Sequence, residues 1–247
     1  LLRTTDFKRY SGRINLDQTF NKWLKLGINS MYSYIDAGNP SIGGQRTNGN
    51  EARQTNAALL FSPNTPLEDA DGTLSKADFP KLPNPAAWFH IKDRTLTKRL
   101  LFVANLEARI ASGLKGNVVF GTDQTSSKRD VFSPTIARLP EQTQENFGGY
   151  ANNENNNLSV EGFLSYDKRI SADHSLSAIV GAGYYKSSGN SYDMTIFNFA
   201  TDALQNNYLE IGGDKDLNTF HSWRWARTKV SQFARLNYTY RDRYILG

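Results

Sequence analysis

The chain has 247 residues, with 29 Lys and Arg against 24 Asp and Glu, and it contains no cysteine. Without cysteine, disulfides, zinc–thiolate sites and thiol nucleophiles are excluded. The formal net charge of +5 comes from basic residues dispersed among acidic and aromatic ones, so we expect no nucleic-acid partner. The longest apolar runs, "AALLF" and "LLFVA", fall far short of the roughly 18 residues expected of a membrane-spanning helix.

The first predicted element is a tight hairpin. Residues 9–20, "RYSGRINLDQTF", alternate apolar and polar side chains, and residues 22–34, "KWLKLGINSMYSY", place an apolar or aromatic residue at nearly every second position. This period of two is typical of strands with one apolar face, and the short gap between the segments predicts a turn. The second segment is about twice the usual length of a strand in a water-soluble domain.

Three further hairpins follow in chain order. The first joins residues 98–111 to 114–123 at Ser112–Gly113, the second joins 157–170 to 175–186 at 172–174, and the third joins 229–240 to 244–247 at 241–243. Long connections are predicted at about 36–96, 125–157 and 187–227. The chain is therefore predicted to be all-β, with about seven or eight antiparallel strands.

Short turns and long connections alternate along the chain, so all short turns fall at one end of the sheet. This sorting is the pattern of an outer-membrane β-barrel, whose apolar face meets lipid. The residues expected to face lipid are Leu16, Leu26, Leu106, Val118, Leu164, Val180 and Leu236. The residues expected to line a wet lumen are Arg13, Asn15, Asp17, Lys25, Asn29, Arg109, Lys115 and Arg235. The alternative from another class is a soluble all-β binding or adhesion module.

The polar face is too rich in long side chains for a small closed barrel. Eight strands leave an interior barely wide enough for side chains, whereas barrels of about 22 strands enclose a plugged lumen. An open sheet edge does not persist in a bilayer, and strand patterns lie at both ends of this chain. We therefore expect an internal part of a larger barrel.

Several segments carry a family resemblance. "SQFARLNYTYRDRYILG" and "GRINLDQTFNKWLKLGINSMYSY" resemble recurring hairpins of SusC-like TonB-dependent outer-membrane transporters. "ALLFSPNTPLEDADG" with "NPAAWF", and "GLKGNVVFGTD" with "VFSPT", are similar to segments of that family in the same order. The resemblance implies that residues 1–247 belong to one barrel domain of about 22 strands in the outer membrane, importing glycans, peptides or similar nutrients. It also implies a plug and a TonB box outside this chain, TonB as energy source, and a SusD-like surface lipoprotein as lid.

No motif indicates an enzyme, a cofactor or a metal site. His90, His174 and His221 are far apart in sequence, without an HExxH pattern, a nucleophile elbow or a P-loop. Asp69–Gly72, "DADG", resembles the start of a calcium loop but lacks its later ligands, so a polar turn is the better interpretation.

Aromatic residues outside the predicted strands are the candidate contacts for a ligand or partner. These are Trp88, Phe89 and His90 in the first long connection, and Trp223 and Trp225 with Arg224 in the last. Aromatic rings stack on apolar ligand faces while neighbouring polar groups fix orientation. The alternatives are packing within the loops or contact with a neighbouring chain.

Overall fold

A computed structural model describes residues 6–39, 54–78, 82–138, 144–213 and 215–247. Its strands form one antiparallel sheet in the order of the chain, so each strand pairs only with its neighbours in sequence. The strands are β1 (Phe7–Thr19), β2 (Leu24–Gly38), β3 (Lys92–Ala111), β4 (Leu114–Ser133), β5 (Phe147–Arg169), β6 (His174–Phe197), β7 (Thr219–Tyr240) and β8 (Tyr244–Leu246). The predicted all-β fold of antiparallel hairpins is confirmed.

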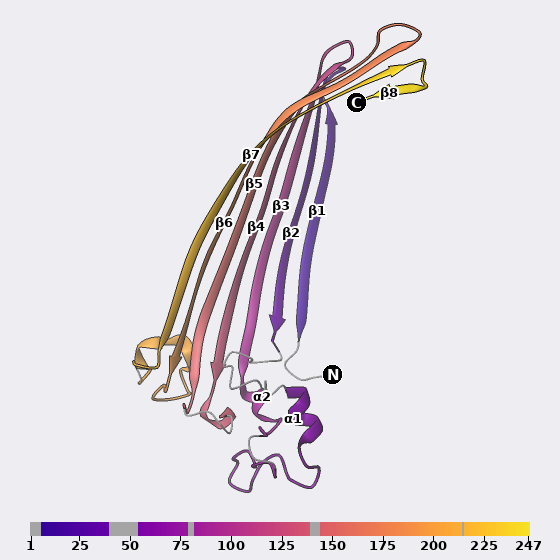
Figure 1. The fold of residues 1–247 in the computed structure, drawn as a ribbon. Coiled ribbons are helices and arrows are strands. Elements are labelled where there is room, and N and C mark those ends of the chain that lie inside the picture. The colour runs from indigo at the N-terminus through magenta and orange to yellow at the C-terminus, as the bar shows by residue number, and fades with distance from the viewer. Residues whose placement is uncertain (1–5, 40–53, 79–81, 139–143, 214) are drawn as a thin grey trace.

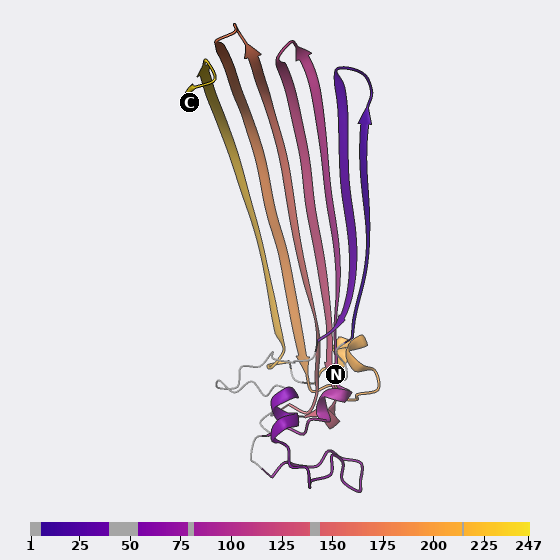
Figure 2. The same ribbon diagram turned by 90° about the vertical axis from the view of Figure 1, so that its right-hand side faces the viewer.

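The two ends of the sheet differ, as Figures 1 and 2 show. One end carries the short turns, and the other carries the long connections with the helices α1 (Gln54–Leu60) and α2 (Ala87–His90). The β1–β2 turn is stabilised by Asn21, whose Oδ1 accepts the backbone amides of Trp23 and Leu24. At the β3–β4 turn, Gly113 has a φ of +81°, and a Cβ there would collide with the carbonyl oxygen of Asp167. These turns fix the hairpin registers.

Residue parity separates the two faces of the sheet. From β1 to β7 the register pairs even-numbered with even-numbered residues, for example Leu106 with Val118, apart from a bulge at the β3–β4 turn. Directly opposed residues in antiparallel strands point to the same side. All seven residues predicted to face lipid therefore share one face, called here the even face: Leu16, Leu26, Leu106, Val118, Leu164, Val180 and Leu236. All eight predicted lumen residues lie on the opposite face, called the odd face.

An apolar band crosses the even face in the half of the sheet nearer the short turns. On β5 it extends from Leu158 to Tyr166 and on β6 from Leu176 to Tyr184. These spans approach the 9–11 residues with which a tilted strand crosses the hydrocarbon layer. The apolar side chains of the band are exposed, as at Leu164 and Val180, which are 44% and 55% exposed.

The predicted bounds of the three long connections are wrong, because the strands continue into them. β4 extends to Ser133 and β5 begins at Phe147, while β6 extends to Phe197 and β7 begins at Thr219. The connections are therefore 39–91, 134–146 and 198–218. The added strand residues, such as the run Asn152–Asn157, are polar on both faces, so hydrophobic alternation does not detect them. The backbone ladder continues through them without interruption.

The connections pack into two small cores at their end of the sheet. The first contains Ala57, Ala87, Trp88, Ile91 and Ala137, the last of which lies in the 3₁₀ helix η1 (Thr135–Ala137). The second contains Phe132, Ile196 and Phe199, with Leu209 and Ile211 packed against it. The 3₁₀ helices η2 (Gln205–Asn207) and η3 (Leu209–Ile211) therefore lie against the even face at the ends of β4 and β6.

Candidate functional site

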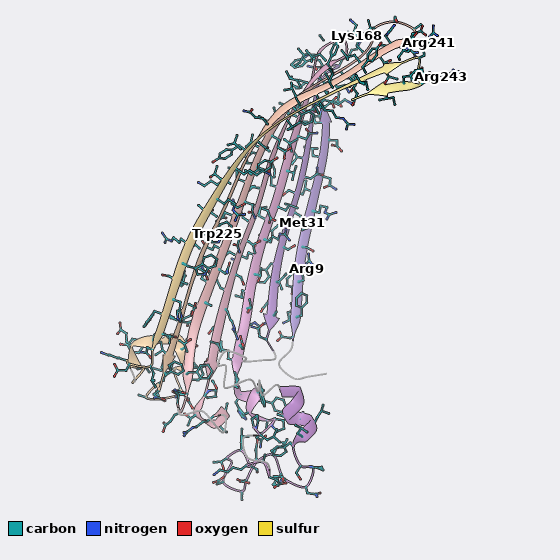
Figure 3. The ribbon with its side chains drawn as sticks, viewed as in Figure 1. Arg9, Met31, Lys168, Trp225, Arg241 and Arg243 are labelled. Carbon is teal, nitrogen blue, oxygen red and sulfur yellow. The ribbon has the colours of Figure 1, made fainter. Side chains whose placement is uncertain are left out.

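A row of aromatic and basic side chains follows the odd face of β7. Its members, called here the β7 row, are His221, Trp223, Trp225, Arg227 and Lys229. Alternation along a strand places every second residue on one side, so the five side chains form a continuous line. Figure 3 labels Trp225 on β7, with Arg9 and Met31 on β1 and β2 near the opposite edge of the sheet.

The strand placement corrects the prediction that Trp223, Arg224 and Trp225 lie outside strands. All three belong to β7, and parity puts the two indoles on the odd face and Arg224 on the even face. The Nε of Arg224 donates a hydrogen bond to Asn190 Oδ1 at 3.1 Å. The predicted trio is therefore divided between two surfaces, because alternation in a strand separates adjacent residues.

The two indoles differ in how they are held. Trp225 is opposite Gly189 on β6, where a Cβ would collide with the indole ring. Trp223 is opposite Ser191 and is 55% exposed, compared with 36% for Trp225. The small residues on β6 thus leave room for Trp225 to lie across the neighbouring strand, with Trp223 more open beside it.

The odd face beside the β7 row is covered by small polar side chains. Asn153, Asn155 and Asn157 of β5 pair with Ser191, Gly189 and Ser187 of β6, which in turn pair with Trp223, Trp225 and Arg227. Asn155 Nδ2 donates to Asn153 Oδ1 at 2.8 Å. Amides and hydroxyls beside an aromatic ring can bond the polar edge of a ligand whose apolar face stacks on the ring.

Electrostatics distinguish the two ends of the β7 row. His221 Nδ1 lies 3.1 Å from Asp193 Oδ2. Lys229 Nζ lies 5.6 Å from the centre of the Tyr185 ring, whose hydroxyl donates to Glu161 at 2.7 Å. Arg227 has no hydrogen bond or ion pair within the described residues. Arg227 and Lys229 therefore present positive charge next to the indoles. Sequence reasoning missed both, although their spacing of two residues from Trp225 carried the signal.

The other three predicted contacts lie in α2. Trp88 is 4% exposed and packs in the first loop core, so its ring is closed to a ligand. Phe89 is 42% exposed, and His90 is exposed as well. For Trp88 the structure favours packing within the loop, which was the alternative to ligand contact.

Asp69–Gly72 forms a polar turn. Gly72 has a φ of +82°, and the backbone amide of Asp69 donates to the carbonyl of Thr73 at 2.8 Å. The amide and hydroxyl of Thr73 both donate to Asp71 Oδ1, which lowers the pKa of the Asp71 carboxyl below its ordinary value. Its carboxylate is thus engaged in shaping the turn.

Among the described residues, no helix is long and apolar enough to cross a membrane. In the same part of the chain, no group of three or more His, Cys, Asp or Glu side chains is arranged to hold a metal ion.

The sheet is built hairpin by hairpin, with an apolar band on one face and polar and aromatic side chains on the other. These features define the wall of an outer-membrane β-barrel. The chain is 27% identical to "TonB-dependent receptor P26" of Formosa agariphila over 254 aligned residues, which cover 100% of this chain and 24% of that protein. It is also 27% identical to "TonB-dependent receptor P3" of the same organism over 249 residues, covering 98% of the chain and 24% of that protein. The chain spans about a quarter of the length of these curated relatives.

The fold matches solved structures of the RagAB peptide importer. The "closed-closed" state superposes with a TM-score of 0.72 at 20% identity, and the "open-open" state with 0.73 at 21% identity. Both matches cover 96% of this chain and 26% of the compared chain. No protein-family model matches the chain. The predicted resemblance of the chain to TonB-dependent outer-membrane receptors is confirmed by the curated relatives, and the predicted barrel-segment fold is confirmed by the solved structures.

Proposed function

We propose that this chain is part of a SusC-like importer that moves glycans, peptides or similar nutrients across the outer membrane with energy from TonB. The observation that carries the proposal is the β7 row on the odd face. An apolar band against lipid on the even face turns the odd face toward the lumen. Trp223 and Trp225 then face the ligand pathway. They lie beside the Asn and Ser side chains of β5 and β6 and beside the charges of Arg227 and Lys229. The names of the relatives support import.

The proposed orientation places connections 39–91, 134–146 and 198–218 outside the cell. Long extracellular loops and short periplasmic turns are the rule in outer-membrane barrels. The three connections extend from the end at which the strands pass beyond the apolar band. In this orientation the β7 row lies above the membrane, where an arriving ligand first meets the wall.

We propose that a SusD-like lipoprotein docks on these connections as a lid. Leu204, Tyr208 and Leu217 in connection 198–218 are 47%, 49% and 39% exposed, and Phe89 in the first connection is 42% exposed. Exposed apolar and aromatic side chains on ordered loops are the residue types that anchor interfaces. TonB would act through a plug that lies outside this chain.

The import proposal is tested with the full-length transporter that contains this chain. Replacing Trp223 and Trp225 by Ala is expected to lower ligand binding and uptake, because both stacking surfaces are removed. Phe220→Ala is the matched control, since Phe220 is a 67% exposed ring on the even face of the same strand. Equal loss in the control variant, or full uptake in the double variant, contradicts the role of the β7 row.

The lid proposal is tested by purification from the native membrane in mild detergent. A lipoprotein is expected in near-equal amount, and Leu204→Ser with Tyr208→Ala is expected to reduce its recovery. Neither side chain belongs to the second loop core, so the fold should persist. A transporter that purifies alone and imports normally contradicts the lid while leaving the barrel intact.

A further inference from the structure

The even face changes from apolar to mainly polar side chains where the apolar band ends, although the strands continue. Above the band, one register row crosses five strands through Lys98, Ser126, Glu154, Asn190 and Arg224. The next row toward the band contains Leu100, Gln124, Asn156, Ser188 and Ala226. A polar surface of amides, hydroxyls and cations therefore borders the band on the same face.

Two shallow hollows lie in this surface and share Asn156. The first, of about 290 Å³, is lined by residues that include Lys98, Gln124 and Glu154. The second, of about 400 Å³, is lined by residues that include Ser188, Asn190 and Arg224. Connection 198–218 packs on the even face further along, at Phe132 and Ile196, and none of its described residues lines either hollow. The hollows are thus bounded by a loop on one side and by the apolar band on the other.

The charge of this surface is positive. Lys98, Lys128, Lys186 and Arg224 are all exposed. The three lysines have no ion-pair partner within the described residues, and Arg224 uses only Nε in its hydrogen bond to Asn190. The acids further along the even face are neutralised locally, since Lys92 pairs with Asp130 at 2.6 Å and Arg94 pairs with Asp36. Glu154 is the one acidic residue in the two hollows.

We propose that the two hollows bind the headgroup of a phosphorylated glycolipid of the outer leaflet. The cations attract its phosphate, and the amides and hydroxyls bond its sugar hydroxyls. Its acyl chains lie along the apolar band, where a broad hollow of about 880 Å³ is lined by residues that include Leu106, Val118 and Val180. The inference rests on the proposed orientation, in which this end of the band meets the outer leaflet, and is independent of the imported ligand.

The test uses the full-length transporter in mild detergent with purified lipid A as the probe, and binding is measured by native mass spectrometry. Replacing Lys98 and Arg224, which line the hollows, together with Lys186, one register row closer to the band than Ser188, by Gln is expected to weaken binding roughly tenfold or more, because three cations in or beside the hollows are lost. Lys168→Gln is the matched control, since Lys168 lies on the even face at the short-turn end (Figure 3). Exchanging Lys and Arg at the same three positions keeps the charge and is expected to keep binding.

Two further probes separate the lipid from a free anion. Lipid A stripped of phosphate is expected to bind more weakly to the unaltered protein, and inorganic phosphate is expected not to displace the intact lipid. The inference is overturned if the triple variant binds lipid A like the parent, if Lys168→Gln loses as much binding, or if the stripped lipid binds equally well. Displacement by inorganic phosphate overturns the lipid assignment in favour of a free-anion site.

The outcome is distinguishable from that of the import proposal. Variants of Trp223 and Trp225 are expected to keep lipid A binding, and the triple variant is expected to keep ligand binding on the odd face. Folding is checked in each case by the gel mobility of the unheated barrel, so a misfolded variant is not counted.

Discussion

Trp225 on β7 lies across Gly189 on β6, in a position that any side chain at Gly189 would obstruct. The glycine therefore positions the indole without contacting a ligand itself. Because an aromatic contact contributes about 0.5–1.5 kcal/mol beyond buried area, displacing the ring should weaken ligand binding roughly two- to tenfold. We expect Gly189→Ala to reduce ligand affinity about as much as Trp225→Ala, as measured by ligand titration of the purified full-length transporter.

Gly12→Ala is the control for this prediction, because a Cβ at Gly12 on β1 meets nothing within 4 Å. The substitution introduces the same methyl group into a strand without a collision. If both alanine variants behave alike, the effect comes from the strand backbone and not from the indole.

An ion pair with a buried carboxylate joins β3 to β4 at the loop end of the odd face. Arg129 Nε donates to Asp93 Oδ1 at 2.8 Å, Asn39 Nδ2 donates to the same oxygen at 2.7 Å, and the Asp93 side chain is 1% exposed. Asp93→Ala should destabilise this end by about 1–3 kcal/mol, because two donors lose their acceptor. We expect earlier proteolysis of the loops and a lower unfolding temperature in detergent.

The pair Arg99–Asp123 provides a comparison with similar geometry but greater exposure. Arg99 donates to both carboxylate oxygens of Asp123, at 2.9 and 2.7 Å, and the two side chains are 48% and 27% exposed. Asp123→Ala should cost only about 0–1 kcal/mol, since exposed pairs contribute little. A larger loss at Asp123 than at Asp93 would show that burial does not decide the contribution.

The assignment of the faces is tested at adjacent positions of β3. Leu106→Lys places a charge in the apolar band and should destabilise the barrel by about 2–4 kcal/mol, whereas Asn105→Lys on the odd face should cost little. Unfolding of the full-length transporter in lipid bilayers by denaturant measures both. Equal tolerance at the two positions would contradict the assigned faces.

The charge of the β7 row predicts a ligand preference. Replacing Arg227 and Lys229 by Gln should weaken binding of acidic glycans or peptides more than that of neutral analogues, and added salt should reduce the difference. Uptake of matched acidic and neutral ligands by whole cells measures the preference. An equal loss of uptake for acidic and neutral ligands would show that Arg227 and Lys229 contribute only to the structure of the barrel wall.

Much of the sheet could be predicted from the sequence because the apolar band imposes a period of two. The sequence predicts Leu106 and Arg109 of the same strand on opposite faces, and the register agrees. The same signal is absent beyond the band, where the strands carry Asn and Ser on both faces. For this reason the sequence predicts loops over residues 147–156 and 219–227, although they form strands.

The candidate site was predicted less completely for a related reason. A predicted loop at Trp223 and Trp225 groups Arg224 with the two indoles and leaves Arg227 and Lys229 out of the predicted site. Strand geometry reverses this grouping, because i and i+2 share a face while i and i+1 do not. The burial of Trp88 depends on Ala137, almost fifty positions away, and no local pattern could indicate that contact.

The chain-order pairing of the sheet also bears on how the barrel assembles. Among the described residues, each strand after β1 pairs with the strand that precedes it in the sequence. No strand there needs a distant segment as its first partner. Local pairing of this kind favours rapid folding, and the cost of closing a loop grows only slowly with its length. The hairpins can therefore enter the membrane one after another. The junction of β2 with β3, which the longest connection separates, is where that progression should slow.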